Sequence, residues 1–303
     1  MTQPRLSAKL VSSNKMGKTL ISYVHFDREE DGIAENVQFF IKHGVIEDDQ
    51  TSFAFVINGG ELSVELPTTY NSRVIYRPNT GYDFAAYNAS LSSINLEEYD
   101  YFIFMNDTVR GPFLPRYIPS SFTWVDLFID KIGERVKLVG PTICYQSPLP
   151  FVPQAHIQSM CFGTDREGVK ILLEAGVFEA GEESGSLTGS DKDRYIMDHE
   201  VKASQCIMDA GYELQPFQLS YPTQVGHGDI HTNHRYGGAT PNPCEIMFIK
   251  TNRITNRVVD NYTRWLLPPP ASFKEGSPCC RRSLIDLPHP INPSLMPSFI
   301  KKG

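Results

Sequence analysis

The sequence predicts an α/β protein in which helices cover both faces of a mostly parallel sheet. Short apolar runs alternate along the chain with amphipathic segments of helical period, the order expected of parallel strands joined by crossover helices. One run, Tyr101 to Met105, is apolar at every position, as in a strand buried on both faces. With 303 residues, of which 41% are hydrophobic and 21% charged, the chain is long enough to bury such a core.

Each expected element has a local signal. Strands are expected where short apolar runs are bounded by turn residues; they are Thr19 to Val24, Ser52 to Ile57, Arg73 to Tyr76, Tyr101 to Met105, Val136 to Val139, His156 to Phe162 and Glu245 to Lys250. Helices are expected where apolar residues recur at helical spacing next to capping residues; they run from Ile33 to the stop at Lys42-His43-Gly44, from Asp83 to Leu91, from a Ser120-Ser121 cap to Ile132, from Asp165 to Ala175, from Arg194 to Ala210 and from Asn252 to Leu266.

The segments between these elements are expected to be irregular. Glu179 to Asp193 is rich in Gly, Ser and acidic residues, and His227 to Pro243 is rich in Gly, His, Asn and Pro. Both are predicted loops. Leu267 to Gly303 contains eight prolines in 37 residues, which predicts an extended, poorly ordered tail. No internal repeat is present.

Composition excludes several classes of protein. The net charge of -7 repels polyphosphate surfaces at long range, which argues against a nucleic-acid binder. A small phosphorylated ligand stays compatible with this charge, because backbone amides, a metal ion or local basic residues can hold it. The sequence has no apolar run of signal or membrane-spanning length, so no integral membrane segment and a cytoplasmic location are expected. The six cysteines lack zinc-type spacing, which predicts mostly reduced thiols.

Asn106 and Asp107 follow directly after the apolar YFIFM run. A carboxylate and an amide at the carboxyl end of a buried strand can hold a divalent cation together with the oxygens of a diphosphate. The competing interpretation is a turn, because Asn and Asp are favoured in turns that follow strands. The spacing alone does not separate these two interpretations.

The segment Arg77 to Asp83 (RPNTGYD) is a Gly-containing loop between an expected strand and an expected helix. It places backbone amides and the Asp83 carboxylate at a helix start, where an anion could meet the amides or the carboxylate could bind a ribose or a base. The pattern is neither GxGxxG nor a Walker A loop, which argues against dinucleotide and P-loop sites. Asp83 as a plain helix cap is the alternative.

Asp198, His199 and Glu200 cluster near the amino end of a predicted helix. A carboxylate held there beside a ligand cleft is a reasonable general base for a hydroxyl. Acidic residues at a helix start are also stabilised by the helix dipole without any catalytic purpose. Both interpretations stay open at this stage.

A second set of metal-type side chains lies in the predicted loop of Gly, His, Asn and Pro; its members are His227, Asp229, His231 and His234. Solvated loop histidines are the favoured interpretation, because spacing in a flexible loop does not supply converging ligand geometry. No GxSxG segment occurs, so a serine hydrolase is disfavoured.

Taken in order, eight segments resemble sugar-transferring proteins of the GT-A type; they are TLISYVHFD, FAFVING, RPNTGYDFAAY, YDYFIFMNDTVRGPFLP, VKLVGPTICY, HIQSMCFGTDREGV, DHEVKASQCIMDAGYEL and PCEIMFIKTNR. The resemblance is closest to the branch of rhamnan-synthesis proteins and rhamnosyltransferase-like domains of algae and their large viruses. The pair NxGxDFAAY and F-[LM]-N-D-x-x-x-GP is its most distinctive part. The resemblance implies a flexible terminus over 1–16, a Rossmann-like GT-A domain over 17–266 and the proline-rich tail over 267–303.

The resemblance also implies an activity, ligands and site residues. The expected reaction is transfer of a hexosyl or rhamnosyl unit from a nucleotide-sugar donor to a glycan hydroxyl, with inversion and with Mn²⁺ or Mg²⁺. Association with other glycan-assembly enzymes is compatible with it. Glu200 is the favoured catalytic base and Asp198 the second candidate, and Asp107 falls at the metal motif, where this chain offers one carboxylate and the DxD pattern has two. The remaining implied residues are Arg77, Asn79, Asp83, Asn106, Lys250 and Arg253 on the nucleotide-sugar side and His156 and Asp165 on the acceptor side.

An inverting transfer needs a base for the acceptor proton and a cationic group for the departing diphosphate, and it needs no protein nucleophile. Two other functions compete with it. The incomplete metal motif also suits a catalytically silent protein that keeps the fold for carbohydrate binding or assembly. A glycoside hydrolase is weaker, because no pair of carboxylates can be identified by spacing.

Overall fold

The computed structural model describes residues 17–27, 33–60, 62–67, 69, 71–115, 117–119, 121–144, 155–181, 189–218, 242–251 and 256–266. These residues belong to one compact unit that ends at Leu266. The predictions for the N-terminus, for the loop containing His227, and for the proline-rich tail lie outside the described residues. Within the described part of the chain, no helix is both long enough and apolar enough to span a membrane.

A seven-stranded sheet with the order β10-β6-β9-β4-β1-β2-β3 forms the centre of the fold. Its strands are β1 (Thr19–Phe26), β2 (Thr51–Asn58), β3 (Ser72–Arg77), β4 (Tyr101–Asn106), β6 (Val136–Gly140), β9 (Cys161–Asp165) and β10 (Glu213–Pro216). All neighbouring strands run parallel except β9, which is antiparallel to both β4 and β6. The predicted mostly parallel sheet is therefore confirmed. We call the edge at which β1, β2, β3 and β4 end the carboxyl edge.

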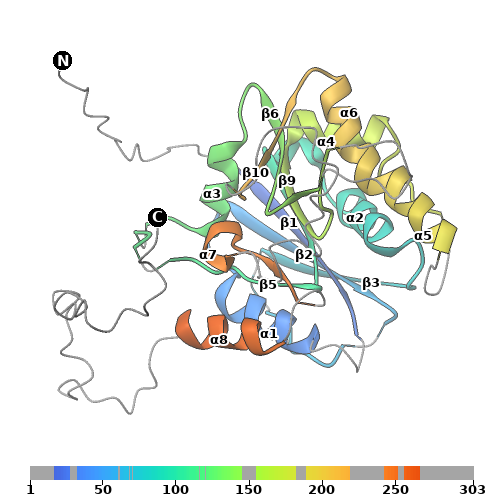
Figure 1. Ribbon diagram of the computed structural model, residues 1–303. Helices are drawn as coiled ribbons and strands as arrows, with labels where there is room; N and C mark the ends of the chain where they lie inside the picture. Colours follow the sequence, from blue (N-terminus) through green and yellow to red (C-terminus); the bar gives the residue numbers. More distant parts are fainter. Residues whose placement is uncertain are drawn as a thin grey trace, which may run out of the picture. The chain divides into compact units, whose positions relative to one another are not determined.

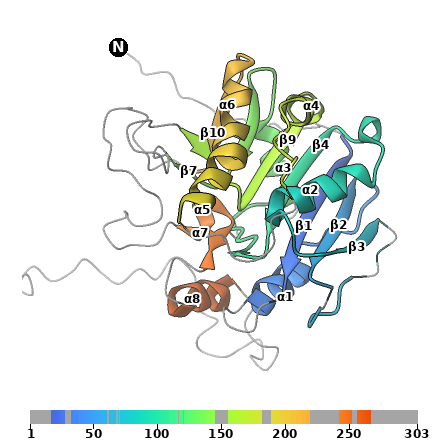
Figure 2. The ribbon, with the colours of Figure 1, turned by 90° about the vertical axis from the view of Figure 1, so that its right-hand side faces the viewer.

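Helices cover both faces of the sheet (Figures 1 and 2). Those on one face are α1 (Ile33–His43) and α3 (Trp124–Lys131), and those on the other are α2 (Tyr82–Ser92), α4 (Arg166–Glu174) and α6 (Lys202–Asp209). Successive side chains of a strand point to opposite faces, and β1 shows this directly. Ile21 and Tyr23 pack in the cluster of α1 and α3, whereas Leu20 and Val24 pack in the cluster of α2, α4 and α6.

Shorter elements complete the unit. Two small antiparallel ladders are β5 (Val109–Arg110) with β11 (Ile249–Lys250) and β7 (Ile143–Cys144) with β8 (His156–Ile157). The other helices are η1 (Leu96–Glu98), α5 (Gly189–Tyr195), the π-helix η2 (Ile196–Val201), α7 (Pro243–Ile246) and α8 (Asn256–Leu266). The β5–β11 ladder brings the late part of the chain next to the end of β4, at the carboxyl edge.

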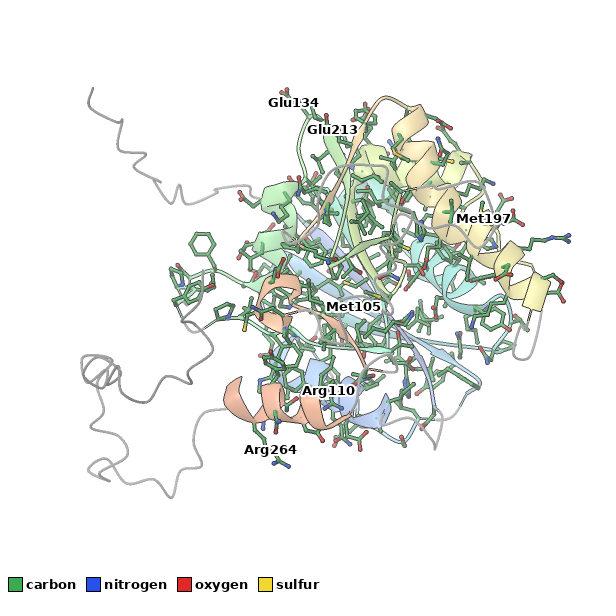
Figure 3. The ribbon with its side chains drawn as sticks, viewed as in Figure 1. Met105, Arg110, Glu134, Met197, Glu213 and Arg264 are labelled. Carbon is green, nitrogen blue, oxygen red and sulfur yellow. The ribbon has the colours of Figure 1, made fainter. Side chains whose placement is uncertain are left out.

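The apolar run of β4 is buried as predicted. Phe102, Ile103, Phe104 and Met105 have no exposed surface. The Phe104 ring stacks on the Phe162 ring of β9, with centroids 5.0 Å apart. Met105, which is labelled near the centre of Figure 3, has no exposed surface. A strand covered on both faces is held rigidly, so the residues that follow it have well-defined positions.

Three local predictions are wrong in detail. The cap of α3 is Thr123, which forms a capping box with Asp126, so the prediction of a Ser120-Ser121 cap was two to three residues early. The run His156 to Phe162 is two strands, β8 and β9, that belong to different sheets. The predicted strand Glu245 to Lys250 begins as the helix α7 and is extended only at β11, because the Asn242 side chain caps a helical turn there.

The predicted helix from Arg194 to Ala210 begins earlier, at Gly189 in α5, and passes through η2 into α6. The predicted loop therefore ends before Gly189. Within this helix the residues Asp198, His199 and Glu200 lie in the π-helical turn. Single π-helical turns inside α-helices occur frequently at functional sites.

Candidate active site

Asp107 is bound to the end of β1. Its Oδ2 accepts a hydrogen bond from the backbone N–H of Phe26 (2.8 Å) and lies 2.9 Å from Nδ1 of His25. Asp107 is 3% exposed and His25 is 1% exposed. The carboxylate therefore ties the turn after β4 to the end of the neighbouring strand.

The same turn is fixed from its other side by Asn36 of α1. The Asn36 side-chain amide donates to the backbone carbonyl of Asp107 (2.8 Å) and to Oγ1 of Thr251 (2.8 Å). Its carbonyl oxygen accepts from Nε of Arg110 (2.8 Å). Arg110 in turn pairs with Asp260 of α8 at 3.2 Å. One fully buried amide thus joins α1, the end of β4 and the segment after β11.

Asn106 faces the opposite way, toward α2. Its amide nitrogen donates to Oδ2 of Asp83 at 2.7 Å, and its carbonyl oxygen accepts from the backbone N–H (3.1 Å) and the hydroxyl of Thr108. Asp83 lies in the first turn of α2, after Gly81 in the left-handed conformation. The structure therefore brings together the two segments that the sequence placed on the nucleotide side.

Tyr195 of α5 closes this side of the site. Its hydroxyl donates to the carbonyl of Gly81 (3.2 Å) and accepts from the N–H of Phe84 (3.3 Å). Burial raises the pKa of Tyr195 well above its ordinary value, and the nearby carboxylates Asp83 and Glu200 raise it further. The tyrosine therefore stays neutral, and both carboxylates lie within its electrostatic reach. Sequence reasoning missed Tyr195, because no local pattern distinguishes it from other helix-surface tyrosines.

Arg77 and Asn79 belong to the loop that leads into α2. Arg77 donates from Nη1 to Oδ1 of Asn58 (2.8 Å) and from Nη2 to the carbonyl of Thr80 (2.7 Å). Burial lowers the pKa of Arg77 from its ordinary value. The Arg77 side chain therefore ties its own loop to the end of β2. Asn79, in the same loop, is half-buried. Both lie at the carboxyl edge, as expected from the end of β3.

Glu200 contacts β8 and the turn that follows it. One carboxylate oxygen, Oε1, lies 3.3 Å from Nε2 of His156. The other, Oε2, accepts from the backbone N–H of Ser159 (2.9 Å) and from the Ser159 hydroxyl. His156 is buried, whereas the Glu200 side chain is 18% exposed. The sequence-predicted base and one predicted acceptor-side residue thus form a direct pair.

The charges of this pair follow from its surroundings. Burial acts to lower the pKa of His156, but hydrogen bonds to Cys144 and Glu200 outweigh it and raise the value to about 10. Burial acts to raise the pKa of Glu200, but the bond and charge of His156, the bond from Ser159 and the charge of Lys250 lower it to about 2. At neutral pH the pair is therefore an imidazolium and a carboxylate.

One turn connects Glu200 with the end of β4. The backbone N–H of Ser159 donates a hydrogen bond to Glu200. The backbone carbonyl of the next residue, Met160, accepts a hydrogen bond from the backbone N–H of Asn106 at 3.1 Å. Lys250 of β11 pairs in register with Val109, close to the same strand end, and its charge acts on Glu200. Three residues therefore lie near one another at the carboxyl edge, close to the end of β4; they are Asn106, Glu200 and Lys250.

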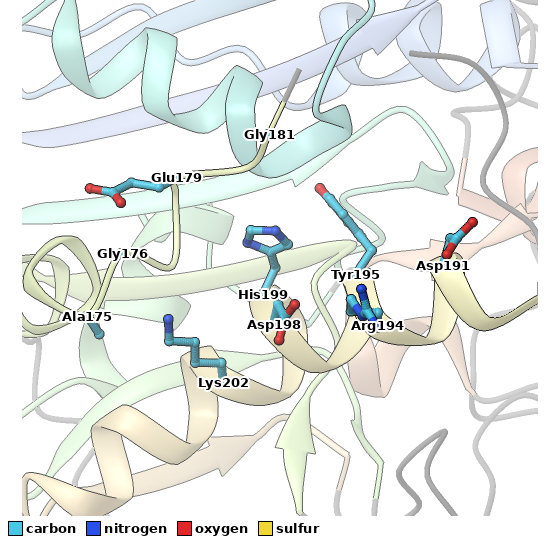
Figure 4. Close-up of a pocket in the computed structure, with 10 residues that line it drawn as sticks. All are labelled: Ala175, Gly176, Glu179, Gly181, Asp191, Arg194, Tyr195, Asp198, His199 and Lys202. Atoms are coloured by element: carbon cyan, nitrogen blue, oxygen red, sulfur yellow. The ribbon is translucent and has the colours of Figure 1, made fainter. Parts of the chain in front are cut away.

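Asp198 does not join them. Residues two apart in a helical turn point in nearly opposite directions, and Asp198 is exposed in a different hollow with Lys202 and Gly176 (Figure 4). The structure therefore does not bring Asp198, the second candidate base, together with Glu200, because the two carboxylates lie on different sides of η2.

Asp165 is also displaced from the site. It pairs with Tyr101 at the start of β4, about 16 Å along the strand from Asn106 at roughly 3.3 Å per residue. Its side chain caps α4 through the N–H of Gly168 and binds Nζ of Lys137 at 2.6 Å. This is the amino edge of the sheet, where Glu213 begins β10 (Figure 3). The structure therefore does not bring Asp165 together with His156 and Glu200, because β9 runs antiparallel to β4 and ends at the amino edge.

The described residues around Asp107 do not fit a divalent cation bound in the expected way. The Oδ2 atom of Asp107 is occupied by Phe26 and His25, and the amide nitrogen of Asn106 points at Asp83. Among the described residues, no three His, Cys, Asp or Glu side chains converge as metal ligands. Arg253 and the loop containing His227 lie outside the described residues. Metal assistance stays a prediction, and no step below depends on it.

Comparisons with known proteins identify the family. The model of RgpF, rhamnan synthesis protein F, matches residues 55–236, more than half of the chain. The chain belongs to this family. The matched range includes Asp83, Asn106, His156 and Glu200, and membership supports its assignment to the glycosyltransferases.

Among solved structures, the catalytic domain of Drosophila beta1,4galactosyltransferase 7 in complex with xylobiose is similar to this rhamnan-synthesis family member. It is 14% identical in sequence, with 73% of each chain covered and a TM-score of 0.31. The comparison with curated proteins found no match.

Proposed function

We propose that the protein transfers a sugar, a hexosyl or rhamnosyl unit, from a nucleotide-sugar donor to a glycan hydroxyl with inversion. The observation that carries this proposal is the turn Ser159-Met160, which binds Glu200 through one residue and Asn106 through the next. A predicted base and a predicted donor contact thereby adjoin at the carboxyl edge, where ligands of parallel α/β sheets bind. Membership in a rhamnan synthesis family supports the same reaction class.

In this mechanism Asp83 and Asn106 contact the nucleotide side of the donor. Lys250 lies next to the end of β4, and its charge reaches Glu200; there its ammonium group offsets negative charge on the departing diphosphate. Glu200 accepts the proton of the acceptor hydroxyl as the new glycosidic bond forms. Because the pKa of Glu200 is about 2, the carboxylate is a weak base, so the proton moves late, after bond formation has acidified the hydroxyl.

The replacement Glu200→Gln tests this role. It removes the charge with little change of shape, and loss of a general base lowers the rate by about 10²–10⁴-fold. The assay measures release of nucleoside diphosphate from UDP-, GDP- and dTDP-sugars with glycan acceptors, with and without Mn²⁺. Glu174→Gln, an exposed carboxylate on α4, is the matched control. Wild-type turnover by a folded Glu200→Gln protein would refute the assignment.

A catalytically silent, carbohydrate-binding protein is the second candidate. The observation that favours it is the low pKa of Glu200, together with its hydrogen bonds to His156 and Ser159, which also suits a purely structural carboxylate. This candidate predicts glycan binding without turnover of any donor. Detectable transfer that depends on Glu200 would exclude it.

A further inference from the structure

A hollow lies on the side of the α5–η2–α6 helix that faces away from His156 and Ser159, the partners of Glu200. It has a volume of about 400 Å³ and lies between the residues that follow α4, Gly176 to Gly181, and the outer side of α5, η2 and α6 (Figure 4). Small-molecule sites have volumes of about 300–1,000 Å³. Asp198 and Lys202 line it, whereas Glu200 points to β8 on the other side of the same helix. The hollow and the candidate active site therefore lie on opposite sides of this helix, and Tyr195 stands at the boundary of both.

The inner wall of the hollow is fixed. Tyr195 is tied by its hydroxyl to Gly81 and Phe84. The Nδ1 atom of His199 lies 2.7 Å from the carbonyl oxygen of Val177. The His199 ring stacks on the Phe84 ring. The two rings of Tyr195 and His199 are in contact, with centroids 4.5 Å apart. A ligand in the hollow thus meets a rigid aromatic wall.

The rim carries charges of both signs. Glu179, Asp191 and Asp198 supply carboxylates, and Arg194 and Lys202 supply cations. Within the described ranges none of these five forms an ion pair, although they share one hollow. The carboxylates do not converge as a metal site among the described residues, and three carboxylates beside two cations leave the rim with an excess of negative charge, which disfavours an anion such as phosphate.

We propose that this hollow binds a neutral sugar unit of a glycan chain, away from the point of transfer. Each sugar hydroxyl both donates and accepts hydrogen bonds, so it can use carboxylates and cations that are not paired with one another. The aromatic wall of Tyr195 adds an apolar surface for a sugar ring. The proposal rests on the proposed function in one respect, since it takes the bound unit to belong to the glycan acceptor.

The test measures binding of a neutral rhamnose trisaccharide by titration calorimetry and ligand-observed NMR. The test variant combines Lys202→Met with Glu179→Gln. Lys192→Met, on the exposed side of α5 outside the hollow, is the matched control. The expected result is a Kd at least about fivefold higher in the test variant, about 1 kcal/mol, and an unchanged Kd in the control. An unchanged melting temperature shows that the test variant is folded.

Transfer kinetics separate this proposal from the proposed function. In the test variant the KM for a long acceptor rises, and kcat and the KM for a monosaccharide acceptor stay at wild-type values. If the wild-type protein binds the trisaccharide but transfers no sugar, and the test variant loses this binding, the glycan site is supported and the proposed transferase activity is refuted. Equal binding by wild type and test variant, no binding at all, or selective binding of inorganic phosphate would overturn the glycan site.

Discussion

The pair formed by His156 and Glu200 makes a prediction about folding stability. Removing one member of a buried ion pair leaves the other charge without its partner and costs about 3–5 kcal/mol. The Glu200 side chain is 18% exposed and keeps its hydrogen bonds to Ser159 in the variant. The expected loss of unfolding free energy for His156→Ala is therefore at the lower end of this range, about 3 kcal/mol. For a domain of this size the melting temperature then falls by roughly 6–12 °C.

The two pKa shifts determine how the stability contributed by this pair changes with pH. The folded-state pKa of His156 is about 10, above its ordinary 6.5, so its contribution is complete below about pH 6.5 and is lost as the pH rises towards 10. The pKa of Glu200 is about 2, below its ordinary 4.5, so its contribution is complete above about pH 4.5 and is lost as the pH falls towards 2. The stability difference between wild type and His156→Ala is therefore largest between pH 4.5 and 6.5 and narrows towards pH 9.

The assay is urea unfolding of wild type, His156→Ala, Glu200→Gln and the double variant at pH 5.5 and pH 9. Because the two residues are in contact, the double variant is expected to lose less free energy of unfolding than the sum of the single variants. Strict additivity at pH 5.5, or a difference between wild type and His156→Ala that does not change with pH, would refute the reasoning.

Three further predictions concern residues around the site. Asn36→Ala leaves several buried polar groups without their partner, and urea unfolding is expected to show a loss of about 2–4 kcal/mol. Asp107→Ala is expected to lower the melting temperature even in EDTA, because the carboxylate accepts the bond from Phe26. Asp165→Asn is expected to reduce stability through the lost charge beside Lys137, while donor turnover stays at the wild-type rate.

Each of these has a clear contrary outcome. A stable Asn36→Ala protein would show that the turn after β4 is held by other contacts. An Asp107→Ala protein that loses Mn²⁺-dependent donor binding at an unchanged melting temperature would restore the metal role of Asp107. A selective rise in acceptor KM for Asp165→Asn would return that residue to the acceptor side.

Much of the architecture was predictable from the sequence, because the burial of a strand or helix is reflected in the spacing of apolar residues within that segment. The continuous apolar run of β4 and the helical spacing of α1 gave their positions to within a residue or two. The family resemblance placed Asp83 and Asn106 on the same side of the expected site, and in the structure the two side chains are hydrogen-bonded to each other. The positions of the strands and helices depend on periodicity, which short segments encode by themselves.

The direction of each functional side chain was decided only by the tertiary structure. Asp107 and Asn106 are neighbours in the sequence, yet one points to β1 and the other to α2. The amide of Asn36 reaches Thr251, 215 positions away, and Glu200 of η2 pairs with His156 of β8. The sequence by itself determined most of the strands and helices of the central sheet and its two layers, whereas the partner of each buried polar group was set by packing between distant segments, which no local pattern records.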